Sequence, residues 1–376
     1  MSAPVTIVAH HVGTAGGMES QLGRVVSGLL ERGYEVTVIA RACAVAPHPR
    51  LRFIRVPGPE RPFSLRFAWF FVAGSVAARR HRRGVLHTTG ALVANRADVC
   101  TVHFCHRAFA QTGLSRADRS SAPYRLNSAL TAWLSRTAEA LAYRPGHTRR
   151  LVGVSLGVGD ELRHLFPDMG EAVSSIPNGV DLERYRPDPV AREQVRAEIG
   201  ATSDELVAAF VGSEWERKGL RHAIEALAGA PRWSLLVAGS GDERRFRGLA
   251  EAAGAASRVR FLGLRDDAPR LLAASDAFLL PTAYETFSLA TFEAAASGLA
   301  LLNTRVHGVQ ELLQDGVNGW FVERDGTDIA RRLRQLEDPE LRTRMGAQAR
   351  EASASFGWEP VVDAYAALYE RLAMAP

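Results

Sequence analysis

Two adjacent cations, Arg217 and Lys218, stand in the segment "GSEWERKGLRHA" (212–223). Lys218 is the only lysine, because 46 residues are lysine or arginine and the other 45 are arginines. Lysine supplies a compact, strongly hydrated charge, whereas arginine supplies a fork that fits two phosphate oxygens. The pair follows an expected strand and opens an expected helix, where cations oppose the helix dipole. A bound anion would relieve this conflict, so the pair indicates a phosphate site; a solvated basic helix end is the alternative.

Two glutamates, Glu285 and Glu293, stand eight residues apart in "YETFSLATFEAAASG" (284–298). On a helix that begins near Thr286 they would lie about 2.2 turns apart, on roughly one side of the axis. The backbone N–H groups of residues 286–290 would then form an anion site at the helix end. Because a carboxylate repels phosphate, we expect Glu285 to accept hydrogen bonds from hydroxyl groups, which suits a phosphate-linked sugar. The alternative is that Glu285 caps the helix and Glu293 is solvated.

The sequence predicts no metal site. It contains no D-x-D motif at a strand end and no cluster of histidine and acidic residues at metal-ligand spacing. The three cysteines, Cys43, Cys100 and Cys105, also lack such spacing and suit a reducing cytoplasm. If a phosphate departs in the reaction, Arg217, Lys218 and helix N–H groups must stabilise its charge in place of a metal.

Strands and helices alternate through both halves of the chain, which predicts an α/β fold with parallel sheets. The segment 5–40 reads as strand, Gly-rich loop, amphipathic helix and strand. The pattern restarts after residue 200, so we expect two Rossmann-like, doubly wound domains with a cleft between them at the carboxyl ends of the strands. We place the N-terminal domain at residues 1–180 and the second at 181–357, with a terminal helix (358–376) that crosses back to the first domain. Residues 175–189 read as turn and linker.

Charge and hydropathy leave a membrane role open. The net charge is +5 and the pI about 9.4, yet no nucleic-acid-binding module is recognisable. The most apolar run, "FAWFFVAGSVAA" (67–78), is too short to span a bilayer, and we expect a buried helix there. Basic flanks around this run leave peripheral membrane binding open. Eight arginines also gather between Cys105 and Arg150, against Asp118 and Glu139: Arg107, Arg116, Arg119, Arg125, Arg136, Arg144, Arg149 and Arg150.

The chain resembles glycosyltransferase family 4, the retaining, nucleotide-sugar-dependent enzymes of the GT-B fold. The resemblance rests on the "RKG" segment combined with the E-x7-E spacing of Glu285 and Glu293, and on "DGVNGWFV" (315–322). It covers the C-terminal half nearly throughout and the N-terminal half more loosely, through "GGMESQLGRVVSGLLERGYEVTV" and "VCTVHF". The nearest likeness is to the lipopolysaccharide core glucosyltransferase branch and to related antibiotic-tailoring enzymes.

The resemblance implies a role for each matching residue. Arg217 and Lys218 would bind the donor diphosphate, Glu285 the sugar hydroxyls and Glu293 the ribose hydroxyls. The remaining expected positions are the backbone of Phe287, Ser288 and Leu289 at the phosphates, Leu262 and Gly263 at the base, Gly16 and Gly17 in the N-terminal loop, and His103 near the donor sugar.

The chain departs from the family at two places. Family members often carry E-G-F-G where this chain has "ETFS", so Thr286 and Ser288 restrict the backbone and could alter sugar selection. His106 stands three residues after His103 and competes for the same assignment.

We therefore expect a cytoplasmic, retaining hexosyltransferase, with peripheral contact with the inner face of an anionic membrane left open. The donor would be a nucleotide-diphosphate sugar, UDP-linked by family frequency, and no cofactor or metal would be required. The acceptor would be a saccharide, a glycolipid or a natural product, and nucleic acid would not be a partner. The alternatives are a nucleotide-sugar epimerase of the same fold and a non-catalytic nucleotide- or anion-binding pseudo-transferase.

Overall fold

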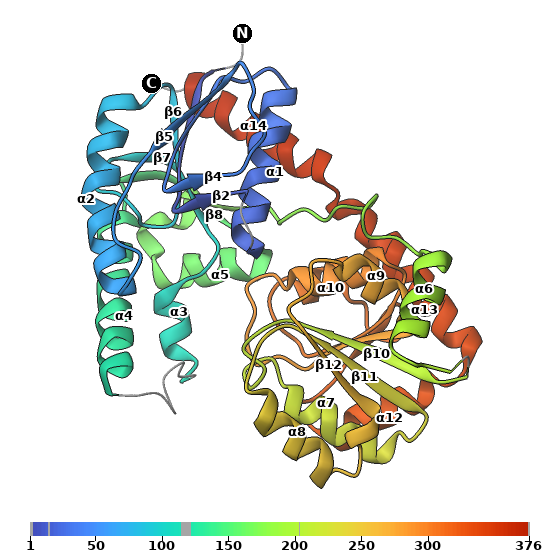
Figure 1. Cartoon of the computed structure of the whole chain (residues 1–376). Coiled ribbons are helices and arrows are strands. Elements are labelled where there is room, and N and C mark those ends of the chain that lie inside the picture. Colours follow the sequence, from blue (N-terminus) through green and yellow to red (C-terminus); the bar gives the residue numbers. More distant parts are fainter. Residues whose placement is uncertain (1–2, 14–15, 114–121, 203, 375–376) are drawn as a thin grey trace. The chain divides into compact units, whose positions relative to one another are not determined.

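The protein folds into two compact units, drawn in Figure 1. Met1–Asn178 and Trp358–Pro376 form the first unit, and Gly179–Gly357 forms the second. None of the helices within the described residues is long and apolar enough to cross a membrane. The computed structural model describes residues 3–13, 16–113, 122–202 and 204–374.

The first unit is built on a parallel sheet of seven strands. Its strands and helices are β1 (Val5–Val8), β2 (His11–Val12), α1 (Gly17–Glu31), β3 (Val36–Ala40), β4 (Ala42–Cys43), β5 (Leu51–Arg55), α2 (Phe63–His81), β6 (Val85–Thr89), β7 (Ala97–Val102), α3 (His106–Gln111), α4 (Ala122–Ala142), β8 (Thr148–Gly153), α5 (Leu156–Leu165), β9 (Val173–Ser175) and α14 (Trp358–Met374). The strand order is β5-β3-β1-β6-β7-β8-β9, and β2 pairs separately with β4.

Helices cover both faces of this sheet, because successive residues of a buried strand point to opposite sides. Val5 and Ile7 of β1 pack in one core with residues of α1 and α14. Val8 packs in a second core with Phe70 of α2. The terminal helix α14 lies so close to α1 that a Cβ added at Gly28 would meet a methyl group of Val362 at 2.7 Å.

The second unit is built on a parallel sheet of six strands in the order β12-β11-β10-β13-β14-β15. Its elements are α6 (Pro189–Glu198), β10 (Leu206–Val211), α7 (Leu220–Ala226), β11 (Trp233–Ala238), α8 (Glu243–Ala252), β12 (Val259–Gly263), α9 (Ala268–Ala273), β13 (Ala277–Leu280), α10 (Leu289–Ala296), β14 (Ala300–Asn303), α11 (Val309–Leu312), β15 (Gly319–Phe321), α12 (Gly326–Gln335) and α13 (Pro339–Ser353). Strands are added to one side of β10 up to β12 and to its other side from β13 onward. The carboxyl ends of β10 and β13 are therefore the switch point of the sheet.

Three strands were not predicted from the sequence: β5, β9 and β15, which end the sheets and are short or carry exposed arginines. One expectation about an element is wrong. The apolar run 67–78 is not a buried helix. It lies in α2, where Phe70, Gly74 and Ala78 are buried while Trp69 and Val72 are exposed. Only one stripe of this helix faces the sheet, and apolar residues on its other side have no described element over them.

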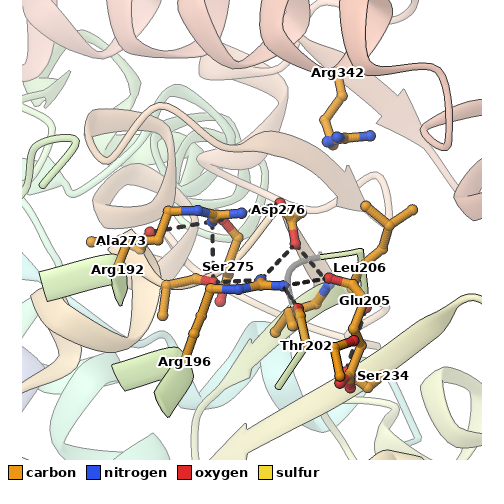
Figure 2. A network of polar contacts seen from close by, with 12 residues as sticks. Arg192, Arg196, Thr202, Glu205, Leu206, Ser234, Ala273, Ser275, Asp276 and Arg342 are labelled. Carbon is orange, nitrogen blue, oxygen red and sulfur yellow. Dashed lines mark hydrogen bonds and ion pairs between the residues drawn. The ribbon is translucent and has the colours of Figure 1, made fainter. Parts of the chain in front are cut away.

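An ion network fastens α6 to the sheet of the second unit at the amino-terminal end of β13. Figure 2 shows its side chains. Asp276 directly precedes β13, and its carboxylate accepts hydrogen bonds from Arg192 at 2.6 Å and Arg196 at 3.2 Å. It also accepts the backbone N–H of Val207 at 2.8 Å. The Arg196 guanidinium in turn donates to the carbonyl groups of Thr202 and Glu205, both at 2.6 Å. The buried charges are thus paired and hydrogen-bonded, as burial requires.

We predict that Asp276→Ala destabilises the second unit by about 3–5 kcal/mol, because it leaves Arg196 buried without its carboxylate. Urea unfolding followed by circular dichroism measures this change. Glu243→Ala is the control, since it removes an exposed ion pair with Arg247 on α8 and should cost at most about 1 kcal/mol. Equal effects of the two substitutions would show that the Asp276 network does not fasten α6.

Candidate active site

Two loops of the second unit meet at the switch point of its sheet. One loop follows β10 and carries Arg217 and Lys218, and the other follows β13 and carries Glu285. Lys218 Nζ lies 2.9 Å from Glu285 Oε1, and Arg217 Nη1 lies 3.4 Å from the same oxygen. The hydroxyl of Thr282 also donates to this oxygen, at 3.1 Å. The structure thus brings together the three charged residues that the sequence singled out, and it adds Thr282, which sequence reasoning missed.

Two cations and two carboxylates form the charged cluster of the site. Lys218 and Glu285 are largely buried, with side chains 14% and 12% exposed. Arg217 also pairs with Glu214 at 2.7 Å and donates to the backbone carbonyl of Tyr284. Two cations thus share the Glu285 carboxylate, and the second acid, Glu214, is more exposed. The carboxylates keep Arg217 and Lys218 charged, because an opposite charge nearby favours the charged form. Cations held in this way can also bind an anion such as a phosphate.

Trp215 anchors the loop that carries the two cations, and sequence reasoning missed this role. Its indole ring is 2% exposed and packs against Phe246 and Phe261. The indole N–H donates to the carbonyl of Gly212 at 3.0 Å. Trp215 therefore fixes the same loop after β10 that carries Arg217 and Lys218.

The helix α10 begins three residues later than the sequence predicted. It starts at Leu289 rather than near Thr286, because Ser288 has a φ of 69° and cannot belong to a right-handed helix. Glu285 therefore lies in the preceding loop, and the expected placement of Glu285 and Glu293 on one side of one helix is wrong. Ser288 and Glu214, with a φ of 57°, are the non-glycine residues with positive φ in the described chain, and both flank the site.

Polar side chains hold the loop before α10. The Ser288 hydroxyl lies 2.8 Å from that of Thr291, which also accepts a hydrogen bond from Asn303 at 3.0 Å. Asn303 is fully buried at the end of β14. The sequence signal for Asn303 is that it is a polar residue at the end of the apolar strand "ALLN". Phe287 stacks on Phe292 of α10, so two contacts with α10 hold the segment that carries Phe287 and Ser288.

Glu293 meets a partner that the sequence analysis had assigned to a linker. The hydroxyl of Tyr185 donates to the Glu293 carboxylate. Burial raises the pKa of Glu293, an effect that the Tyr185 hydrogen bond and the nearby Arg184 partly offset. Burial and the adjacent Glu293 also raise the pKa of Tyr185. Glu293 is therefore an enclosed acceptor and not a solvated helix residue.

The two residues expected at the base lie farther along the same sheet. Leu262 and Gly263 end the edge strand β12, and both are half-buried. The carbonyl of Gly263 accepts the N–H of Gly239 at 2.8 Å. The strand β11 separates β12 from β10, so these two residues lie to one side of the Lys218–Glu285 pair.

In the first unit, His103 follows β7 and lines a cavity of about 170 Å³ together with His106, His10 and Glu139. Burial lowers the pKa of His103 to about 4. The Glu139 carboxylate accepts the backbone N–H of His106 at 2.7 Å, and burial raises its pKa to about 7. His103 and His106 both line this cavity, so both remain candidates for the histidine near the donor sugar.

The glycines of the N-terminal loop lie at the start of α1. Gly16 precedes the helix with a φ of 136°, and Gly17 is its first residue. Both are exposed. Among the described residues there is no group of three or more histidine, cysteine, aspartate or glutamate side chains that could hold a metal ion.

Each half of the chain matches a described glycosyltransferase family. Residues 15–184 match "Glycosyltransferase Family 4", and residues 191–352 match "Glycosyl transferases group 1". The chain is 30% identical over 394 residues to the D-inositol 3-phosphate glycosyltransferase of Mycobacterium ulcerans, covering 96% of this chain and 82% of the relative. It is 36% identical over 174 residues to the lipopolysaccharide core biosynthesis glycosyltransferase LpsE of Rhizobium meliloti, covering 45% of this chain and about half (51%) of that relative.

Solved structures have the same fold. WaaG, a glycosyltransferase involved in lipopolysaccharide biosynthesis, superposes with a TM-score of 0.78 at 22% identity, covering 96% of this chain and 98% of WaaG. Anabaena Alr3699/HepE, solved in complex with UDP-glucose, superposes with a TM-score of 0.74 at 19% identity, covering 97% and 98%. The fold is therefore GT-B, with two Rossmann-like α/β units.

We predict that Gly212→Ala displaces Lys218 from Glu285. Gly212 has a φ of 148°, and an added Cβ would lie 2.6 Å from Cδ of Lys218. Loss of one charge-assisted contact should weaken nucleoside diphosphate binding about tenfold or more, measured by calorimetry. Gly248→Ala is the control, because a Cβ there meets nothing within 4 Å and alanine suits the interior of α8. Unchanged binding in Gly212→Ala would exclude this positioning of Lys218.

We also predict that the His103 imidazole stays neutral as the pH falls from 7 to about 5, because its lowered pKa of about 4 lies below this window. The unfolded chain binds a proton at its ordinary pKa of about 6.5, so this group disfavours folding below that pH and has no such effect above it. Nitrogen-15 NMR of the ring, assigned with a His103→Gln variant, measures the charge state. A titration midpoint near 6.5 would contradict the prediction.

Proposed function

Because this chain belongs to glycosyltransferase family 4, we propose that it moves a hexose from a UDP-sugar to a hydroxyl group of a saccharide, glycolipid or natural-product acceptor. The transfer would retain the anomeric configuration and require no metal. The observation that carries this proposal is the contact of Lys218 and Arg217 with one oxygen of Glu285, at 2.9 Å and 3.4 Å. A diphosphate and a sugar need such cations and such an acceptor side by side.

The cations at this site would stabilise the departing diphosphate. Negative charge develops on the phosphate oxygens as the bond to the sugar breaks, and fixed cations in a partly buried site stabilise that charge strongly. Lys218 would act as a point charge, and Arg217 would offer its fork. The two cations also balance the negative charge of Glu285. The repulsion between this carboxylate and a bound diphosphate is therefore reduced, and Glu285 can accept hydrogen bonds from the sugar hydroxyls.

The nucleoside would be held by Glu293. The two hydroxyl groups of a ribose can both donate to one carboxylate, and the Tyr185 hydroxyl already donates to the carboxylate of Glu293. Support for a uridine nucleotide comes from Alr3699/HepE, which was solved with UDP-glucose on the same fold. Leu262 and Gly263 would lie against the base.

The acceptor would bind in the first unit, at the cavity that His103 lines. A neutral His103 can exchange hydrogen bonds with a hydroxyl but cannot supply a positive charge. Gly16 and Gly17 would let the chain approach the phosphates closely. For a retaining transfer we favour front-face displacement, in which the acceptor oxygen bonds to the anomeric carbon as the phosphate oxygen leaves and takes the acceptor proton.

The names of two relatives support a polyol as acceptor. D-inositol 3-phosphate glycosyltransferases are named for a phosphorylated cyclic polyol, and LpsE for the lipopolysaccharide core. Both names describe polyhydroxylated acceptors. A polyol hydroxyl is therefore the acceptor group that we propose here.

We predict that Lys218→Ala lowers sugar transfer or donor hydrolysis by about 100-fold or more, while the fold stays intact by circular dichroism, because Arg217 and Thr282 still donate to Glu285. Nucleotide-sugars are first screened by thermal shift and slow hydrolysis with EDTA present. A single UDP-sugar should stabilise the wild type, and this shift should disappear in Lys218→Ala. Arg221→Ala is the matched control, because Arg221 is a half-buried cation of α7 three residues away whose described ion pairs do not include Glu285.

Each part of the proposal fails separately. Near-normal turnover of Lys218→Ala would remove its role, and loss of activity with EDTA would contradict metal independence. Conversion of the donor to an epimer would favour an epimerase, and binding without any turnover would favour a pseudo-transferase. The anomeric configuration of the product, measured by NMR, tests retention.

A further inference from the structure

Two neighbouring helices of the first unit, α2 and α4, expose rows of apolar side chains. They pack against each other, and the Ser64 hydroxyl donates to the Asn127 side chain at 2.8 Å. Both lie along one side of the unit (Figure 1). Exposed apolar side chains that gather on a surface, unlike single ones, mark an interaction site. The exposed residues are Leu65, Trp69, Val72 and Val76 of α2 and Leu126, Leu130, Trp133 and Leu141 of α4, here called the α2/α4 surface.

The rows follow helical spacing. Along α2 they recur at intervals of four, three and four residues, so they form one stripe opposite the buried Phe70 and Gly74. The stripe is strongly exposed: Trp69 is 50%, Val72 64% and Trp133 56% accessible. Trp69 is also held in place, because its indole N–H donates to the carbonyl of Pro57 at 2.8 Å. A fixed, half-exposed tryptophan is typical of membrane interfaces.

The charge around this surface is positive. The sequence of α2 contains no acidic residue, and its stripe runs into the exposed Arg79 and Arg80. The α4 helix contributes the exposed Arg125 and Arg136. Its one acid, Glu139, is 2% exposed and accepts backbone N–H groups of α3, so it does not offset these charges at the surface. Two other arginines of the sequence cluster, Arg116 and Arg119, lie outside the described residues.

We propose that the α2/α4 surface docks onto an anionic membrane, with the tryptophans and aliphatic side chains in the interface and the arginines at the headgroups. Apolar stripes bordered by arginines match the chemistry of such a surface. A second copy of the chain fits less well, because an isologous dimer would bring two arginine-rich faces together.

The inner sides of the same helices support this assignment. Phe63 and Phe67 of α2 and Ser135 and Glu139 of α4 line the cavity that contains His103. The elements that would touch the lipid therefore also border the proposed acceptor site. This link rests on the proposed function, whereas the docking itself does not.

Sedimentation with vesicles tests the docking without any measurement of activity. The wild type should bind vesicles of phosphatidylcholine mixed with phosphatidylglycerol, bind vesicles of phosphatidylcholine alone weakly, and lose affinity as salt rises. Trp69→Ala with Trp133→Ala should weaken anionic binding about tenfold or more. Arg79→Gln with Arg80→Gln should weaken it about tenfold or more and flatten the salt dependence. Val72→Ser with Leu126→Ser tests the same surface without touching a tryptophan.

The controls change the same chemistry on the other unit. Arg244→Gln with Arg344→Gln removes the same charge from exposed sites, and Val190→Ala with Leu264→Ala removes exposed apolar groups. Both should leave vesicle binding unchanged. The proposal is overturned if the wild type ignores anionic vesicles, if the arginine controls weaken binding as much as the α2 pair, or if light scattering shows that this surface instead forms a dimer. Failure here leaves donor binding by Lys218 untouched, so the two proposals are separable.

Discussion

One carboxylate oxygen, Oε1 of Glu285, joins the two loops of the candidate donor site. It meets Lys218 at 2.9 Å, Thr282 at 3.1 Å and Arg217 at 3.4 Å. The loops are distant in sequence, but β10 and β13 are parallel neighbours, so their carboxyl ends lie side by side at the same end of the strands. A carboxylate that is largely buried is stable only when donors surround it. The cations are therefore held in position before any ligand arrives, which is the condition for electrostatic stabilisation of a departing group.

The same strand carries two ion clusters with different uses. Asp276 precedes β13, and its two arginines also donate to backbone carbonyl groups, so little of their hydrogen-bonding capacity is left. Glu285 follows the end of β13, where Lys218 Nζ donates to its carboxylate. The Arg196 guanidinium donates to Asp276 and to two backbone carbonyl groups, so few of its N–H groups remain for a ligand. Lys218 has three N–H groups, and those not used by Glu285 can turn toward an anion. The number of hydrogen bonds already made, rather than the ratio of charges, separates the two clusters.

The helices α2 and α4 of the first unit have two different faces. The inner faces of α2 and α4 close the cavity around His103, and burial there keeps the pKa of that imidazole near 4. Their outer faces expose tryptophan, leucine and valine among arginines. The two helices thus connect a cavity with histidine side chains, in which a hydroxyl can be held, with an apolar surface suited to lipid.

The sequence alone determined the parallel sheets and the residues Arg217, Lys218 and Glu285, because strand–helix alternation and residue type are local properties; the GT-B fold was implied by the resemblance of its motifs to a family. Tertiary structure decided three things that the sequence did not predict. Ser288 adopts a left-handed conformation and delays α10, Tyr185 reaches Glu293 from a segment read as linker, and Trp69 is exposed on a helix expected to be buried. Each depends on what lies opposite in space: a periodic pattern shows that a face is apolar, but only packing decides which element, if any, covers it.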